Sequence, residues 1–242
     1  LRNLQLSEEA AAALSVDAAA IAEQNLRAAR QSALLVEAFS ASRIPLLFVK
    51  GLTLSKLAYG DPFIKMSQDV DVLVPSGTIA EAAGVLDRLG YRLEIPSQSA
   101  QLERWHRQRK ESVWRSPDGL MLDLHSRLAD SQELIPKIGV HSPQQLVEVA
   151  PGIVLPTLAD EELFAYLCVH GASSAWFRLK WIADLAALLN DRSTWRDRTA
   201  VRALPTARRR ASGRAGAAPR RGDLRYDHRE RAGAKAFRTA GQ

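Results

Sequence analysis

A strict alternation of acidic and aliphatic residues at 67–75, SQDVDVLVP, is the feature that most limits how this chain can fold. Side chains of a β-strand point to opposite faces in turn, so Asp69, Asp71 and Leu73 share one face and three valines share the other. A wholly aliphatic face is typical of a buried one, which makes the acidic face the wall of a cleft. Two carboxylates this close repel each other unless a cation or a basic side chain neutralises them. The segment therefore predicts a strand with positive charge beside it.

A second segment, GLMLDLH at 119–125, repeats this geometry. Its three leucines share one face, while Asp123 and His125 share the other. If the two strands are neighbours with their aliphatic faces on the same helices, Asp123 lies on the same side as the acids at 69 and 71. The hard oxygen ligands of three converging carboxylates suit Mg²⁺ or Mn²⁺. Two such ions could clamp an in-line phosphoryl displacement, one at the attacking oxygen and one at the leaving pyrophosphate.

A strand-to-helix junction upstream is a candidate phosphate-binding turn. IPLLFVK at 44–50 predicts a short buried strand, and residues 52–59 predict a helix. Gly51 lies between them, and a residue without Cβ lets backbone N–H groups approach a phosphate at a helix N-terminus. Lys50 and Lys65 could add positive charge near a triphosphate.

The remaining segments predict an α+β fold. Residues 8–42 contain no Gly or Pro and indicate one or two helices, with Ser7 as the N-cap. A helix capped by Ser76 or Thr78, a strand at 91–95 and a hairpin at 111–125 follow. The pattern becomes helical again from 143 to 190, with Asp160 near a cap position. We therefore expect four parts: an N-terminal helical segment at 1–43, an α/β core with a mixed sheet at 44–128, a helical C-terminal part at 129–190, and an Arg-rich tail at 191–242.

Positive charge is concentrated in the tail. Residues 191–242 hold 15 of the 33 Lys and Arg but 5 of the 27 Asp and Glu, so residues 1–190 hold 18 basic and 22 acidic residues, a net charge of −4. The body thus has no nucleic-acid footprint, and nucleic acid is an expected partner only through the tail. Three interpretations of the tail stay open: a nucleic-acid-binding arm, a disordered end, or an out-of-frame stretch of a GC-rich gene that truncates the helical part.

Cysteine usage and hydropathy indicate the cytoplasm. Cys168 is the single cysteine, so the chain can form no internal disulfide. The longest apolar run, at 44–49, is far shorter than the roughly 20 residues that a membrane span requires. No secretion signal is recognisable at the start. We expect no membrane partner.

The order of these motifs resembles that of a known family. LLFVKGLTLSKLAYGDPFIKMSQDVDVLVP, followed by LGY, MLDLH and HGASSAWFRLKWIADLAALL, is similar to the bacterial family called uncharacterised nucleotidyltransferase, within the polymerase-β-type superfamily. The resemblance covers residues 30–190. It implies a nucleotidyltransferase-like sheet and Mg²⁺-dependent transfer of a nucleotidyl group from an NTP to a hydroxyl or phosphate acceptor. The acceptor, whether a small molecule, a saccharide or a protein, cannot be read from the sequence.

By this resemblance Asp69 and Asp71 match the family's D-x-D metal ligands, and Asp123 matches a third carboxylate that shares a metal and helps deprotonate the acceptor. Lys50 and Gly51 match its nucleotide-binding turn. The chain departs from the wider pattern at two positions. Leu52 follows the glycine where Gly or Ser is usual, so Thr53 is the nearest hydroxyl, and Lys65 stands where the family commonly has Arg, which replaces bidentate phosphate contact by a point charge.

Each motif also has a structural alternative. The D-x-D acids could form a solvated strand edge, and Asp123 could pair with Arg115 or Arg127. Lys50 could face water, and His125 is expected to be a neighbour of the site rather than a catalyst. Residues on the last two helices could line the cleft, but their spacing is more typical of core: His170, Trp176, Arg178, Lys180 and Asp184. The alternative function is a catalytically inactive nucleotidyltransferase-fold module that binds a nucleotide or protein in a biosynthetic or toxin–antitoxin cluster.

Overall fold

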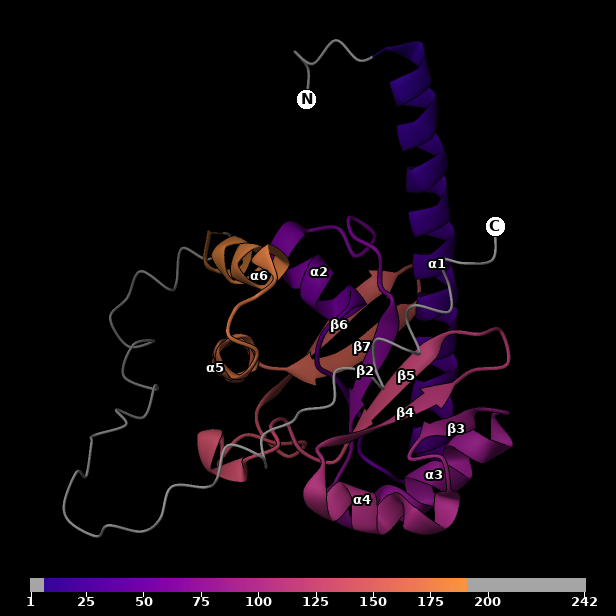
Figure 1. Cartoon of the computed structure of the whole chain (residues 1–242), viewed down its shortest axis with the longest axis vertical. Helices are drawn as coiled ribbons and strands as arrows, with labels where there is room; N and C mark the ends of the chain where they lie inside the picture. The colour runs from indigo at the N-terminus through magenta and orange to yellow at the C-terminus, as the bar shows by residue number, and fades with distance from the viewer. Residues whose placement is uncertain (1–6, 191–242) are drawn as a thin grey trace, which may run out of the picture. The chain divides into compact units, whose positions relative to one another are not determined.

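The computed structural model describes residues 7–190 (Figure 1). All of them belong to one unit of the chain, Leu1–Leu204. The expectations for the tail at 191–242 concern residues outside this described part. Within residues 7–190, no helix is long and apolar enough to cross a membrane.

The N-terminal segment is one helix, α1 (Glu8–Ala41), which confirms the helical prediction for this stretch. Ser7 is its N-cap, because its Oγ accepts a hydrogen bond from the backbone N–H of Ala10 at 3.2 Å. Two glutamates in the first turn complement the positive end of the helix dipole. The second half of α1 is buried through a stripe of mostly small and apolar residues: Asn25, Ala28, Ala29, Ser32, Leu35 and Phe39.

A five-stranded mixed sheet forms the centre of the fold, in the order β1-β2-β5-β4-β3. Strand β2 pairs in parallel with β5, and the other neighbours pair antiparallel. Both acidic segments found in the sequence are therefore central, adjacent strands. The bounds are β1 (Leu47–Phe48), β2 (Asp69–Leu73), β3 (Arg92–Ile95), β4 (Glu111–Arg115) and β5 (Met121–His125).

Short helices connect these strands. The helix α2 (Leu52–Tyr59) follows β1 and has the bounds predicted from the sequence. The crossover from β2 to β5 includes the turn η1 (Ser76–Thr78), α3 (Ile79–Arg88), η2 (Ser99–Gln101) and α4 (Leu102–Gln108). Thr78 stands at the N-cap of α3 but makes no side-chain cap, since its hydroxyl donates to the carbonyl oxygen of Pro75.

The two faces of the sheet are buried against different elements. The aliphatic residues of β2 and β5 pack with α1 and α3 in one core cluster, which includes Val72, Leu122 and Leu124. Leu73, on the acidic face of β2, belongs to a second cluster with α5 (Asp160–Ser173) through Leu163 and Tyr166. The acidic face is thus directed toward the C-terminal helices, α5 and α6 (Leu179–Asn190) (Figure 1).

The prediction of helices throughout 143–190 is wrong for its first part. Residues 144–158 form a two-stranded antiparallel sheet of β6 (Gln144–Ala150) and β7 (Ile153–Leu158), with Gly152 in the turn at φ +75°. Val147 and Val149 are buried while Glu148 between them is exposed, which is the period of two that defines a half-buried strand. The helical prediction holds for α5 and α6 only. Asp160, predicted near a cap position, is the first residue of α5 and follows the N-cap Ala159.

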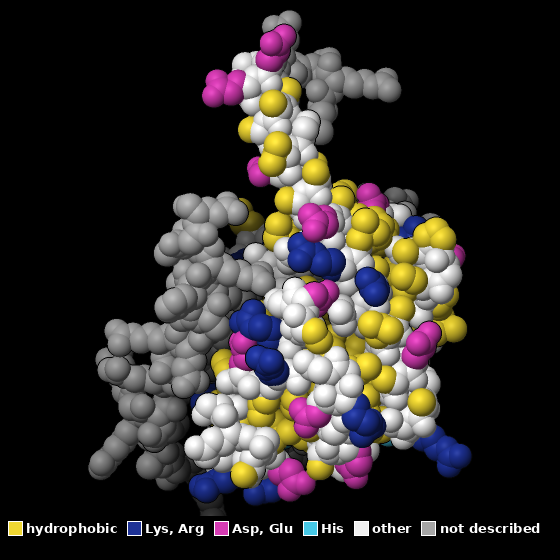
Figure 2. Space-filling model, turned by 90° about the vertical axis from the view of Figure 1, so that its right-hand side faces the viewer, with side chains coloured by type: hydrophobic (Ala, Val, Ile, Leu, Met, Phe, Trp, Pro, Cys, Tyr) yellow, Lys and Arg dark blue, Asp and Glu magenta, His cyan; other side chains and the backbone are white. Residues whose placement is uncertain are grey.

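On the face seen in Figure 2, basic and acidic side chains are interspersed. This face of the described residues shows no broad area of a single charge.

The aliphatic face of β5 is expected to dominate stability. Leu124 is 0% exposed in the main core cluster, whereas Leu146 on β6 is 74% exposed. Replacement Leu124→Ala should lower the free energy of unfolding by about 2–5 kcal/mol, because it removes buried surface and leaves a cavity. Urea denaturation followed by circular dichroism measures the change. Leu146→Ala is the matched control, expected within about 0.5 kcal/mol of the parent, and equal losses in both variants would contradict the burial of this face.

Candidate active site

The register of the central strands sets the site. In the parallel pair of β2 and β5, Asp71 lies directly opposite Asp123, and Leu73 lies opposite His125. In the antiparallel pair of β4 and β5, Glu111 lies opposite His125. Partners in a ladder and residues two positions apart on one strand point to the same face. Acidic groups from three strands therefore share the face that is directed toward α5.

Lys50 supplies the positive charge that the sequence predicts for this face. Its Nζ lies 2.7 Å from Oδ1 of Asp71, and the lysine side chain is 20% exposed. Burial acts to raise the pKa of Asp71, but the charge of Lys50 and the hydrogen bond from His125 outweigh it and hold the pKa well below its usual value. Burial likewise acts to lower the pKa of Lys50, and the charge of Asp71 more than reverses this effect. Lys50 is thus a half-buried counter-ion of Asp71, not a lysine that faces water.

Asp123 is less well compensated than Asp71. Burial, followed by the charges of Asp69 and Asp71, raises the pKa of Asp123 to about 8. The ammonium groups of Lys50 and Lys110 oppose this shift only in part. The charges of Lys50 and Lys110 are therefore not enough to keep Asp123 ionised near pH 7.

His125 lies at the centre of this buried group, with 0% of its surface exposed. Its Nε2 lies 3.1 Å from Oδ1 of Asp71, and its Nδ1 lies 3.3 Å from Oε2 of Glu111. Glu111 in turn pairs with Lys110. Burial, with the charge of Lys110, lowers the pKa of His125 to about 4, so the ring is neutral near pH 7.

The donor atoms fit a divalent cation. Ligand atoms of Asp71, Asp123 and His125 lie within 4.8 Å of one another, and all three side chains are buried. Two carboxylates and an imidazole are established protein ligands of divalent metals. Asp69 shares the strand face of Asp71, but it is only half-buried and does not belong to this group of ligand atoms. Near pH 7 the carboxyl group of Asp123 is mostly protonated, so a cation that binds there would replace its proton.

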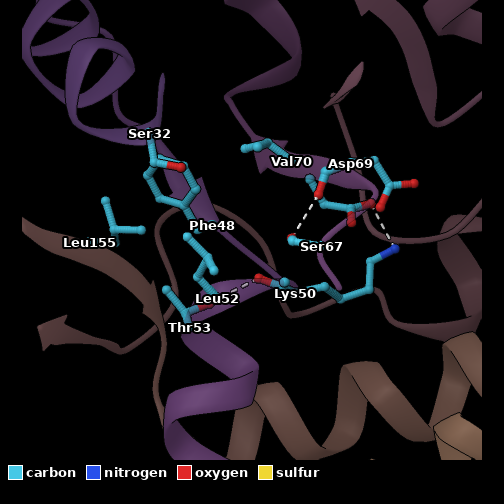
Figure 3. A pocket seen from close by; sticks show the side chains of 11 residues that line it. Ser32, Phe48, Lys50, Leu52, Thr53, Ser67, Asp69, Val70 and Leu155 are labelled. Atoms are coloured by element: carbon cyan, nitrogen blue, oxygen red, sulfur yellow. Dashed lines mark hydrogen bonds and ion pairs between the residues drawn. The ribbon is translucent and has the colours of Figure 1, made fainter. Parts of the chain in front are cut away.

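A pocket lies where β1 ends and β2 and α2 begin (Figure 3). Five of the predicted site residues line it: Lys50, Gly51, Thr53, Asp69 and Asp71. The candidate phosphate-binding turn and the D-x-D acids thus lie close together. The cavity itself has room for about one water molecule, and its other lining residues include Phe48, Val70 and Leu155 of the main core cluster. Lys65 and Asp123 are not among the lining residues.

Gly51 is required at this turn for two reasons. It adopts φ +67° and ψ −127°, which is not a conformation that residues with a Cβ adopt readily, and a Cβ there would lie 3.0 Å from Oγ of Ser67. Thr53 donates from Oγ1 to the carbonyl oxygen of Lys50 at 3.1 Å, which fixes the turn. Gly51 is the N-cap of α2, and it has no side chain that could accept a hydrogen bond from the first N–H groups of the helix.

Lys65 has a different environment from the one predicted. Its Nζ lies 2.5 Å from Oδ1 of Asp184 on α6, and the hydroxyl of Tyr59 donates to the same oxygen at 2.8 Å. The structure therefore uses Lys65 to join the segment before β2 to α6. The sequence left Arg115 and Arg127 as alternative partners of Asp123, and both make other contacts. Arg115 pairs with Glu94, and Arg127 donates a hydrogen bond to the carbonyl oxygen of His106.

The sequence did not single out Asn25, which organises the loop that leads into β2. Its Nδ2 donates to the carbonyl oxygens of Phe63 and Lys65, and its Oδ1 accepts from the N–H of Ser67. The signal in the sequence was a polar residue, Asn25, at a position of α1 where the helical period predicts a buried side chain. Glu111, which faces His125, could be recognised only from the register of β4 and β5.

The chain belongs to the family described as uncharacterised nucleotidyltransferase, whose model matches residues 2–213. The match is longer at both ends than residues 30–190, over which the sequence motifs resemble the family. Membership supports nucleotidyl transfer as the general activity. Among curated proteins, none matches the chain.

Three solved structures illustrate what the fold is similar to. The antibiotic-resistance factor ANT(2'')-Ia, in its solution structure, is 15% identical, with 67% of this chain and 84% of that one covered and a TM-score of 0.46. The lincosamide antibiotic adenylyltransferase LnuA, with lincomycin bound, is 15% identical, with 63% and 90% covered and a TM-score of 0.41. An antigenic nucleotidyltransferase-like protein from Paracoccidioides brasiliensis is 13% identical, with 67% and 75% covered and a TM-score of 0.43.

The raised pKa of Asp123 predicts a pH dependence of stability in metal-free buffer. A carboxyl group whose folded pKa is about 8, against 3.8 ordinarily, contributes stability that is complete below about pH 4 and is lost as the pH rises to about 8. Asp123→Asn cannot ionise, so it should become more stable than the parent toward pH 8. A tenfold difference in proton affinity between the folded and unfolded chain corresponds to about 1.4 kcal/mol.

Chemical denaturation at pH 4, 6 and 8 in the presence of a chelator measures this difference. Asp87→Asn, at an exposed position on α3, is the matched control and should follow the parent at every pH. Parallel pH profiles for the parent and Asp123→Asn would contradict the raised pKa of Asp123.

Proposed function

We propose that this chain transfers a nucleotidyl group from an NTP to a hydroxyl or phosphate acceptor, with Mg²⁺ or Mn²⁺ held by Asp69, Asp71 and Asp123. The observation that carries the proposal is the register of β2 and β5, which sets Asp71 opposite Asp123. Membership in the nucleotidyltransferase family supports the reaction class. The nearness of Gly51 to Lys50, Asp69 and Asp71 supports placing the phosphates of the nucleotide at this turn.

The three aspartates have related roles in this proposal. Asp69 and Asp71 hold the cation from one strand, and Asp123 completes the oxygen ligands from the next. Asp123 also accepts the proton of the acceptor hydroxyl. When bound, the cation neutralises phosphate charge and lowers the pKa of the attacking oxygen.

The turn at Gly51 holds the phosphates. The first N–H groups of α2 face an anion with the positive end of the helix dipole behind them. Thr53 keeps this turn in shape through its hydrogen bond to the carbonyl oxygen of Lys50. Replacement of the glycine would bring a Cβ against Ser67 and close the approach of a phosphate.

Lys50 links the acids to the phosphates. In the described structure its ammonium group neutralises Asp71. A divalent cation competes with this ammonium group for the same carboxylate, so its binding frees Lys50 to neutralise the triphosphate. Lys65 has no such role in the proposal, because it pairs with Asp184 away from the pocket lining.

The proposal predicts that transfer depends on Asp71. With an NTP labelled at its α-phosphate, a divalent cation and a panel of hydroxyl and phosphate acceptors, the parent should transfer label to an acceptor. Asp71→Asn should lower kcat by about 10²- to 10³-fold, the usual cost of losing one preorganised electrostatic contact. Circular dichroism checks that the variant is folded.

Asp87→Asn is again the matched control and should retain full activity, since Asp87 is exposed on α3. Undiminished transfer by Asp71→Asn would contradict the proposed site. Tight binding of an NTP by the parent, without transfer to any acceptor, would favour a non-catalytic binding module.

A further inference from the structure

His125 is the one member of the donor group that offers nitrogen. Its ring is fully buried, and both of its nitrogens are directed at carboxylates rather than at apolar groups. Nε2 faces Asp71 at 3.1 Å, and Nδ1 faces Glu111 at 3.3 Å without the geometry of a hydrogen bond. Nδ1 is therefore a buried polar atom without a hydrogen bond among the described residues, which is a costly arrangement.

The position of Glu111 supports a ligand role for this ring. A histidine that binds a metal through one nitrogen almost always donates its other N–H to a carboxylate, a carbonyl or water, which fixes the tautomer. Glu111 stands opposite His125 in the β4–β5 ladder and faces Nδ1. In the described structure Nε2 hydrogen-bonds to Oδ1 of Asp71. Binding of a cation at Nε2 therefore requires the proton to move to Nδ1, where Oε2 of Glu111 lies 3.3 Å away to accept it.

We infer that Nε2 of His125 is a ligand of the divalent cation, together with Asp71 and Asp123, and that the site therefore prefers Mn²⁺ to Mg²⁺. The inference rests on the proposed function and refines its metal site. The three ligand atoms already lie within 4.8 Å of one another. Glu111 is a positioning residue, because it acts on the cation through the ring.

The preference follows from ligand chemistry. Mg²⁺ takes oxygen ligands and keeps several waters, and imidazole is a ligand of transition metals such as Zn²⁺ and Fe²⁺. Mn²⁺ shares the oxygen ligands of Mg²⁺ but is a transition metal, so a nitrogen ligand favours it over Mg²⁺. A purely oxygen site also favours Mn²⁺ to some degree, so the informative quantity is how far the preference changes when the nitrogen is removed. His125→Asn removes the imidazole and leaves both aspartates of the donor group in place.

The alternative is that His125 only holds Asp71 in position by a hydrogen bond. That role requires Nε2 to carry the proton, and a protonated nitrogen cannot bind a metal. The two roles therefore differ in whether a histidine nitrogen touches the bound ion. Electron spin echo envelope modulation of bound Mn²⁺ detects such a nitrogen directly.

The experiment uses the full chain with Mn²⁺ and without nucleotide. The parent should show ¹⁴N modulation that is replaced when histidine is labelled with ¹⁵N, and that is lost in His125→Asn and His125→Gln. Competition between Mn²⁺ and Mg²⁺ should show the Mn²⁺ preference falling at least about tenfold in these variants, the scale of losing a well-oriented ligand contact.

His106→Asn is the matched control, because His106 is also buried but binds the hydroxyls of Ser126 and Ser112. It should keep the nitrogen signal and the metal preference. Absence of a histidine signal in the labelled parent overturns the inference even if the variants at 125 do not fold.

Bound Mn²⁺ without a histidine nitrogen signal would overturn the inference and leave the proposed function standing. Failure of the parent to bind Mn²⁺ at all would overturn both this inference and the metal site of the proposed function. Loss of the signal in His106→Asn but not in His125→Asn would also overturn the assignment.

Discussion

The parallel pairing of β2 with β5 places Asp71 and Asp123 directly opposite each other where almost no solvent reaches. Burial and mutual repulsion both oppose the ionised state of such a pair, so the fold must hold positive charge in the same place. Lys50 neutralises Asp71 at 2.7 Å, while the pKa of Asp123 stays near 8. Asp123 is thus mostly protonated near pH 7, and a cation that binds between the two carboxyl groups would replace its proton.

The surrounding elements are arranged to keep this group in place. Lys50 directly precedes Gly51, so one short turn supplies both the counter-ion and the start of α2. Asn25 of α1 holds the loop before β2 through three hydrogen bonds, and the pair of Lys65 and Asp184 ties that loop to α6. Movement of any one of these segments would shift the acids relative to the turn, which connects the packing of the helices to the chemistry of the pocket.

Local patterns predicted much of this fold because they record which face of an element is buried. The alternation at 69–74, the uninterrupted helical stretch of α1 and the glycine after β1 were all informative. The strands at 144–158 were missed because a short run such as QQLVEVA was merged with the helical pattern after it. The pairing of Lys65 with Asp184, and the position of Glu111 opposite His125, depend on tertiary packing and register, which no local period encodes.

Diffraction from crystals grown with Mn²⁺ and a non-hydrolysable NTP analogue, recorded for anomalous scattering, tests the central claim most directly. The account predicts an anomalous peak between the carboxylates of Asp71 and Asp123, phosphates at the Gly51 turn, and the ammonium group of Lys50 moved from Asp71 to the phosphates. A peak remote from these two acids, with the ion pair of Lys50 and Asp71 unchanged and the nucleotide bound elsewhere, would contradict it.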